Sequence, residues 1–237
     1  ETWSKLKNYH QMNIISAHIG LDSLNEKSIK LLESLECSQI VIPSIIAEWN
    51  FRTPINYLQK IPLIGNIATK QLNQLAPFRF LSTKNIFKNK NFFKIIFWEE
   101  VADHLNLLHK KYPHLKIGLH NHGLELHPIE EGITPWNILN DKLDHNIFYQ
   151  LDIGNAALSN QDPFKIFNKY RNRIKSLHYK IPFQPRKKFL AKENCQKIIR
   201  EFSKLNNPPQ IICEVSSKKK NPFDELNKLV DELKLIN

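Results

Sequence analysis

The sequence predicts an α/β fold in which a parallel sheet is covered by helices. Short apolar runs alternate with amphipathic segments, and strands separated by helices are typical of βαβ units. No shift in composition marks a linker, so we expect a single domain over residues 1–237. Polar side chains follow several of the apolar runs, as at the active face of a parallel α/β barrel.

Six short apolar runs are long enough for buried strands and too short for helices of their own. They cover residues 13–18, 39–43, 116–121, 148–152, 174–178 and 210–214. Helices are predicted between them from apolar residues at helical spacing, over residues 23–36, 99–112, 134–139, 162–170, 191–205 and 221–235. Three of these helices begin with a polar cap followed by proline, at Thr134, Asp162 and Asn221.

The stretch between the second and third predicted strands is longer than one helix requires. Helical spacing is suggested over residues 57–75, and a cluster rich in Lys, Asn and Phe follows at residues 84–94. We therefore expect an insertion around residues 50–97.

Composition excludes several classes of protein. Apolar residues make up 41% of the chain, which is too many for a disordered protein. No run of about 18 apolar residues occurs, so we expect no membrane span. Three cysteines cannot build a disulfide framework, and their odd number fits a reducing compartment, from which we expect a cytoplasmic protein.

The net charge is the unusual feature, because 34 Lys and Arg against 23 Asp and Glu give +11. An excess of this size suggests polyanions as partners, whereas the simpler interpretation is a solvated lysine-rich surface. Both interpretations stay open at this stage.

Four potential ligands stand at the carboxyl ends of predicted strands: His120, Asp152, His178 and Glu214. In a parallel barrel these ends meet on one face, so the four side chains should converge. Clustered carboxylates and imidazoles repel or desolvate each other unless a cation or shared protons neutralise them, and a bound divalent metal is the economical solution. Oxygen and nitrogen ligands without thiolates suit Mn, Mg, Co, Fe(II) or Zn.

The segment from His120 to Glu125 carries further candidates. Residues two apart on a strand face the same side, so His120 and His122 should both point into the mouth and Asn121 away from it. Glu125 lies in the following loop, near enough to return to the same site.

Several motifs in order resemble the sugar phosphate isomerase/epimerase superfamily, the xylose-isomerase-like barrels that include the fold of AP endonuclease family 2. Residues 119–126 (LHNHGLEL) resemble the YHNHDFEF motif of one branch, and residues 151–154 (LDIG) resemble a strand end of the family. The Asp-Pro, Lys-Tyr, Arg-Ile and His-x-Lys run of the family has counterparts in residues 162–163, 169–170, 173–174 and 178–180, and the final strand Glu in Glu214.

This resemblance implies an eight-stranded (β/α) TIM-type barrel with a divalent metal at its carboxyl-terminal mouth. Asp152, His178 and Glu214 would be metal ligands, and the fourth would be Glu125 or His120, with Glu125 favoured because a third carboxylate better neutralises a dication. His120, His122 and Lys180 would be catalytic, while His18 and Asn155 would face the substrate.

The chain also departs from the family pattern. Asn155 stands where relatives have His or an aromatic residue, Ile181 stands where Asp is usual, and Gly123 replaces an Asp. The matched strands correspond to the third to eighth of the family, so we expect that the first one or two βα units are missing from this chain.

We expect a metal-dependent isomerase, epimerase or lyase that removes a proton next to a carbonyl and forms a metal-stabilised enediolate. Its partner would be a small sugar, sugar phosphate or polyol, with no membrane and no nucleic acid; a homo-oligomer stays open. The alternatives are a non-catalytic barrel that serves as a binding domain and, less favoured, a nuclease of the AP endonuclease type.

Overall fold

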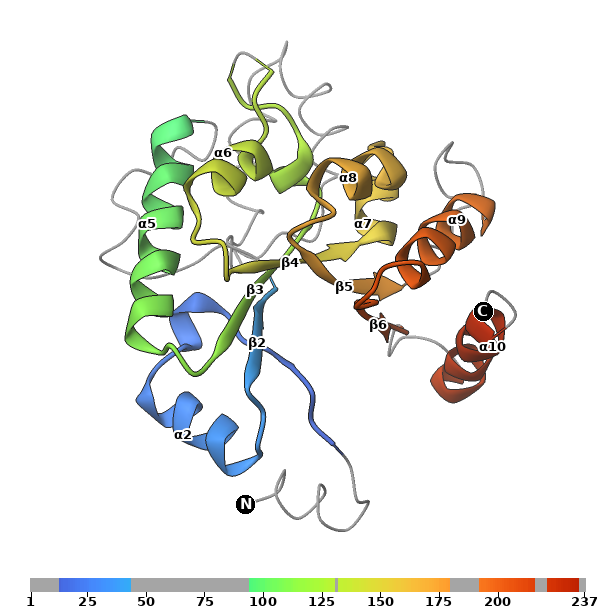
Figure 1. Cartoon of the computed structure of the whole chain (residues 1–237), viewed down its shortest axis with the longest axis horizontal. Coiled ribbons are helices and arrows are strands. Elements are labelled where there is room, and N and C mark those ends of the chain that lie inside the picture. Colours follow the sequence, from blue (N-terminus) through green and yellow to red (C-terminus); the bar gives the residue numbers. More distant parts are fainter. Residues whose placement is uncertain (1–12, 44–93, 131, 180–191, 216–220, 235–237) are drawn as a thin grey trace, which may run out of the picture. The chain divides into compact units, whose positions relative to one another are not determined.

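The computed structural model describes residues 13–43, 94–130, 132–179, 192–215 and 221–234 (Figure 1). They fall into two compact units, the first within residues 1–120 and 128–148 and the second within residues 121–127 and 149–237. Each unit is built on parallel strands that are connected through helices.

The first unit contains three parallel strands: β1 (Ala17–His18), β2 (Gln39–Ile42) and β3 (Lys116–His120). β2 and β3 are buried almost throughout, as expected for parallel strands covered on both faces. β1 is shorter than the predicted run over residues 13–18, because Asn13 and Ile15 are exposed and only Ala17 and His18 pair with β2.

The helices in the described part of this unit are α2 (Glu26–Ser34), α5 (Ile95–Lys111) and α6 (Pro135–Lys142), with a 3-10 turn, η1, at Leu21–Ser23. α5 buries Trp98, Val101, Ala102 and Leu105, which share one helical face, and it packs against α6. It begins four residues before the predicted start at residue 99, since Phe97 and Trp98 extend its buried face.

One close approach in the first unit requires glycine. A Cβ atom at Gly118 of β3 would overlap the aromatic ring of Phe148. The missing side chain therefore makes room for a buried phenylalanine, and a larger residue would overpack this position.

The second unit contains β4 (Phe148–Asp152) from Tyr149 onwards, together with β5 (Ile174–Tyr179) and β6 (Gln210–Cys213), which are also parallel. Its helices are α7 (Ile153–Leu158), α8 (Pro163–Tyr170), α9 (Lys192–Ser203) and α10 (Pro222–Lys234), and η2 (Leu124–Leu126) is a 3-10 turn. The rings of Phe167 and Phe202 join α8 to α9 with centroids 5.4 Å apart.

The three predicted helix caps are confirmed. Thr134 accepts a hydrogen bond from the backbone N–H of Asn137 at 3.2 Å, and Asp162 accepts one from that of Phe164 at 2.9 Å. Asn221 accepts from the backbone N–H of Asp224 at 3.4 Å. These side chains satisfy amide groups that the first helical turn leaves without partners.

The structure confirms the predicted α/β class with parallel strands. The expected insertion lies outside the described residues except for its last four positions, 94–97, and the single-domain assignment stays a prediction. Within the described ranges, no helix has both the length and the apolar character that crossing a membrane requires.

Candidate metal centre

Strand register brings two predicted ligands together in the second unit. Asp152, the last residue of β4, lies directly opposite His178 of β5. The Asp152 side chain is 0% exposed and His178 is 7% exposed. His178 Nδ1 lies 3.7 Å from Oδ2 of Asp152.

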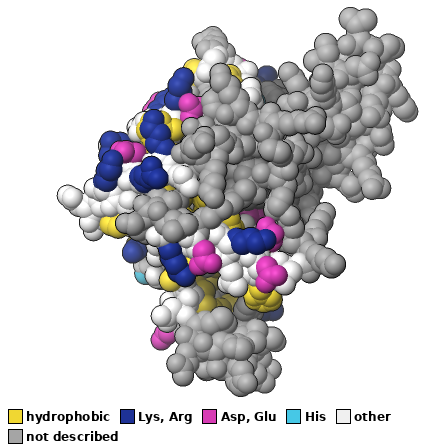
Figure 2. Space-filling model, turned by 90° about the vertical axis from the view of Figure 1, so that its right-hand side faces the viewer, with side chains coloured by type: hydrophobic (Ala, Val, Ile, Leu, Met, Phe, Trp, Pro, Cys, Tyr) yellow, Lys and Arg dark blue, Asp and Glu magenta, His cyan; other side chains and the backbone are white. Residues whose placement is uncertain are grey.

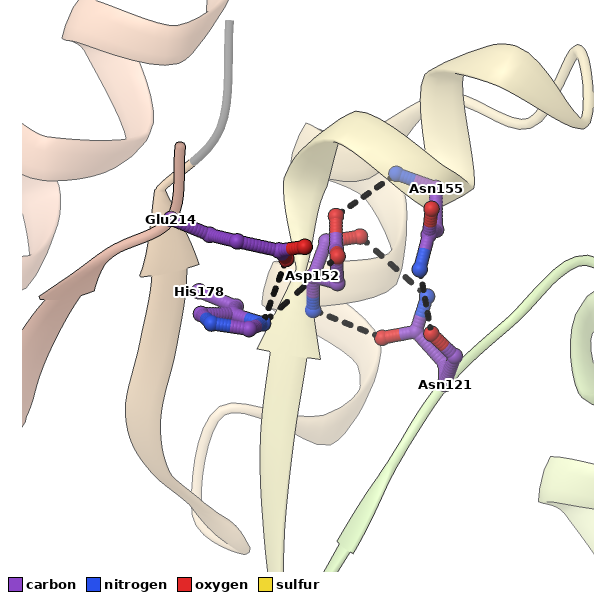
Figure 3. Close-up of polar contacts among 5 residues, drawn as sticks. All are labelled: Asn121, Asp152, Asn155, His178 and Glu214. Atoms are coloured by element: carbon purple, nitrogen blue, oxygen red, sulfur yellow. Dashed lines mark hydrogen bonds and ion pairs between the residues drawn. The ribbon is translucent and has the colours of Figure 1, made fainter. Parts of the chain in front are cut away.

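Glu214 joins this pair from the end of β6. Glu214 directly follows Cys213, the last residue of β6, which lies opposite Tyr179 of β5. Its backbone N–H donates to the carbonyl of Tyr179 at 3.0 Å, which holds it at this position. Figure 3 shows the Glu214 carboxylate directed at His178, with Oε2 3.4 Å from Nδ1.

The donor set fits a divalent metal ion. Ligand atoms bound at about 2.0–2.2 Å to one ion lie roughly 3–4 Å apart, and both separations from Nδ1 fall in this range. Two carboxylates around one imidazole leave excess negative charge beside a buried side chain, which favours a cation there. Asp152 and His178 also belong to a buried group of His and Asp side chains whose ligand atoms lie within 4.8 Å of one another and could hold a metal ion. Glu214 is not a member of that group.

Asp152 has a second role at the same position, because it is the N-cap of α7. Its Oδ1 accepts a hydrogen bond from the backbone N–H of Asn155 at 2.6 Å. β4 therefore passes directly into α7 without a connecting loop. One carboxylate oxygen holds the helix terminus while the other faces His178.

Asn121 does not turn away from the site, so that expectation is wrong. β3 ends at His120, and the two-residue alternation of a strand therefore does not extend to Asn121. The side chain of Asn121 is 0% exposed and hydrogen-bonds to the backbone of Asp152 at both N and O.

Glu125 and His122 form a tight turn. Oε2 of Glu125 accepts from the backbone N–H of His122 at 3.0 Å, and the Glu125 side chain is fully buried. Burial raises the pKa of Glu125 to about 7, against the smaller opposing effect of backbone hydrogen bonds. Glu125 belongs to no described group of three or more His, Cys, Asp or Glu ligand atoms lying within 4.8 Å of one another.

Three of the other predicted site residues lie in the described part of the chain. In the first unit, the exposed His18 and the buried His120 end their strands with ring centroids 5.3 Å apart. Asn155 is half-buried in the first turn of α7. Lys180 lies outside the described residues, as does Ile181.

Sequence reasoning missed a second buried polar pair beside these ligands. Gln150 and Ser176 are opposite each other in register, two residues before Asp152 and His178, and both are fully buried. Alternation places them on the same side of the sheet as the two ligands. The only signal in the sequence was a polar residue inside each apolar run.

No protein-family model and no curated protein matches this chain. Solved structures do. A sugar phosphate isomerase/epimerase from Parabacteroides distasonis ATCC 8503 aligns with 99% of this chain and 76% of its own, at a TM-score of 0.59 and 16% identity. A second sugar phosphate isomerase/epimerase structure from the same organism aligns with 98% of this chain and 90% of its own, at a TM-score of 0.53 and 14% identity.

A 3-keto-D-glucoside 4-epimerase from E. coli aligns with 98% of this chain and 82% of its own, at a TM-score of 0.51 and 10% identity. At identities this low, the structural likeness shows a common fold alone. A common fold does not by itself fix activity. The resemblance of the motifs to the sugar phosphate isomerase/epimerase superfamily is thus confirmed at the level of the fold, which this chain shares with these structures.

Proposed function

We propose that this protein is a metal-dependent isomerase, epimerase or lyase that acts on a sugar, sugar phosphate or polyol with a carbonyl group. The observation that carries the proposal is the buried Asp152 carboxylate, which together with Glu214 flanks Nδ1 of His178. The fold shared with an isomerase/epimerase and a 3-keto-glucoside epimerase supports the choice of substrate class.

Asp152, His178 and Glu214 would hold the ion, with Glu125 or His120 as the fourth ligand. Oxygen and nitrogen donors are compatible with Mn, Mg, Co, Fe or Zn, so the set does not select one of them. When bound, the ion would act as a Lewis acid that polarises a carbonyl oxygen and lowers the cost of removing the neighbouring proton.

The chain's own residues would move that proton and orient the substrate. His120 and His122 are the candidate bases, because an imidazole nitrogen can accept a proton and return it. Lys180 would stabilise negative charge that develops on the substrate. His18 and Asn155 would contact substrate hydroxyl groups, and these roles rest on the motifs of the sequence.

Elemental analysis of the purified protein, reloaded with each metal in turn, tests the ion. We expect one ion per chain in the wild type and none in Asp152→Asn, which keeps the capping oxygen but loses the charge. Asp162→Asn is the matched control, since Asp162 also caps a helix, and it should retain the ion.

Exchange of substrate protons with D₂O tests the chemistry, because isomerases, epimerases and lyases of this kind all remove a proton next to the carbonyl. We expect deuterium to be incorporated into members of a panel of ketoses, keto-glucosides and their phosphates, and NMR measures this incorporation. Chelation should abolish it. A wild type that binds none of the five metals, or exchange that persists after full chelation, would overturn the proposal and favour a non-catalytic binding domain.

A further inference from the structure

Three residues of the second unit form a closed ring of hydrogen bonds from side chain to backbone (Figure 3). Asn121 Nδ2 donates to the carbonyl of Asp152 at 3.1 Å, and the N–H of Asp152 donates to Asn121 Oδ1 at 2.7 Å. The N–H of Asn155 donates to Asp152 Oδ1 at 2.6 Å. Asn155 Nδ2 closes the ring by donating to the carbonyl of Asn121 at 3.2 Å.

The ring fixes both the backbone and the side chain of Asp152. Asn121 uses its donor and its acceptor on the two backbone groups of Asp152, as a neighbouring strand would do. The backbone of Asn155 then fixes Oδ1, which leaves Oδ2 on the side of His178 Nδ1. Since Asn121 and Asp152 are fully buried, water does not compete for these hydrogen bonds.

We propose that Asn121 is a positioning residue that sets the direction of the Asp152 carboxylate toward the metal, and that Asn155 supports it through the backbone of Asn121. This inference rests on the proposed function. It also gives Asn155 a role that needs no contact with substrate. Residues that orient metal ligands typically change metal affinity by 10–100-fold when they are replaced.

Cobalt(II) is the probe for the test, because its visible absorption reports ligand geometry while calorimetric titration reports affinity. Asn121→Ala should weaken Co²⁺ binding about 10–100-fold and change the visible spectrum of the bound ion. Asn155→Ala keeps the backbone N–H that donates to Asp152 Oδ1 and loses only the hydrogen bond from Asn155 Nδ2 to the carbonyl of Asn121. It should weaken binding by less, and it provides the result if Asn121→Ala does not fold.

The chain offers a matched control in Asn106 of the first unit. Asn106 also uses its donor and its acceptor on backbone groups, although of two residues, donating to the carbonyl of Lys142 at 2.9 Å and accepting from the N–H of Asp144 at 2.8 Å. Asn106→Ala should lower the urea midpoint of unfolding, because it removes two hydrogen bonds that hold the backbone. It should leave the Co²⁺ affinity and the visible spectrum of the bound ion unchanged.

The outcomes separate the two proposals. Tight Co²⁺ binding by the wild type with unchanged affinity and spectrum in Asn121→Ala and Asn155→Ala overturns the positioning role alone. Equal losses in Asn106→Ala also overturn it, because the effect would then be general destabilisation. A wild type that binds none of Mn, Mg, Co, Fe and Zn overturns the proposed metal centre, and the positioning role with it. If the wild type binds another of these ions but not Co²⁺, the affinities of the same variants are compared with that ion.

Discussion

At the scale of single residues, the buried carboxyl group of Glu125 makes stability depend on pH. Burial raises its pKa from the ordinary 4.5 to about 7 in the folded protein. The folded state therefore binds an extra proton between these two pH values. The contribution of the protonated Glu125 carboxyl group to stability is complete below about pH 4.5. It decreases as pH rises through this window and is lost above about pH 7.

Replacing Glu125 by Gln should remove this dependence, because Gln keeps an oxygen for the His122 N–H and does not ionise. We expect the wild type to lose roughly 3 kcal/mol of unfolding free energy relative to Glu125→Gln between pH 5 and pH 8. Urea unfolding of both proteins at the two pH values, with a chelator present, measures the difference.

Glu100→Gln is the matched control, since Glu100 is exposed on α5. It should follow the wild type at both pH values. If Glu125→Gln also follows the wild type, the carboxyl group is ionised in the folded protein at neutral pH, and its burial is compensated in another way.

Candidate residues at strand ends could be found from the sequence, and their supporting partners could not. Asp152, His178 and Glu214 interrupt the apolar pattern of parallel strands, so each is visible as a polar residue at a strand end. Asn121 was misassigned because alternation was extended one residue past the end of β3. Its partner, the backbone of Asp152, is 31 residues away in the chain and leaves no local pattern.

At the scale of elements, the sequence predicted where a helix begins better than whether a short helix is present. Polar residues followed by proline marked α6, α8 and α10 because capping and the fixed proline φ are local effects. α7 was missed because its six residues, Ile153–Leu158, follow a strand without a turn signal and include Gly154. Its cap, Asp152, was interpreted as a strand end and a ligand.

The double role of Asp152 predicts different costs for two substitutions. Asp152→Ala removes the cap of α7 as well as the charge, so it should be less stable than Asp152→Asn by about 1 kcal/mol. The same comparison at Asp162, the cap of α8, should give a similar difference. Urea unfolding of the four apo proteins measures both.

Metal binding in the same variants separates capping from ligation. Both Asp152 variants should lose the ion and both Asp162 variants should keep it. The unfolding free energies of Asp152→Ala and Asp152→Asn could instead be equal while those of the two Asp162 variants differ by the expected amount. That result would show that the hydrogen bond from the Asn155 N–H to Asp152 does not stabilise α7.

At the scale of the whole molecule, the net charge of +11 raises the question whether the described Lys and Arg side chains gather into a basic face. Figure 2 shows Lys and Arg side chains next to Asp and Glu side chains on one described face. Exposed ion pairs join Lys204, which follows α9, to Glu201 at 2.7 Å, and Lys234 of α10 to Asp231 at 3.1 Å. Such a mixed surface favours the interpretation that the lysines form a solvated surface.

Binding to DNA tests the nuclease alternative directly. We expect only weak association with a duplex containing an abasic site, falling steeply between 50 and about 200 mM salt, as counterion release requires. No nicking should occur with Mg²⁺, Mn²⁺ or Zn²⁺ present. Salt-resistant binding together with metal-dependent nicking would instead support an AP endonuclease activity.

The direct passage from β4 into α7 also limits how this protein can diversify. Loops that connect strands to helices are the usual places where barrels gain or lose residues as new specificities arise. At Asp152 the strand end, the helix cap and the candidate ligand are one residue, so this corner cannot change in length without displacing all three. Evolution of substrate preference would therefore have to use other loops, and the corner at Asp152 would stay fixed in length among descendants that keep the site.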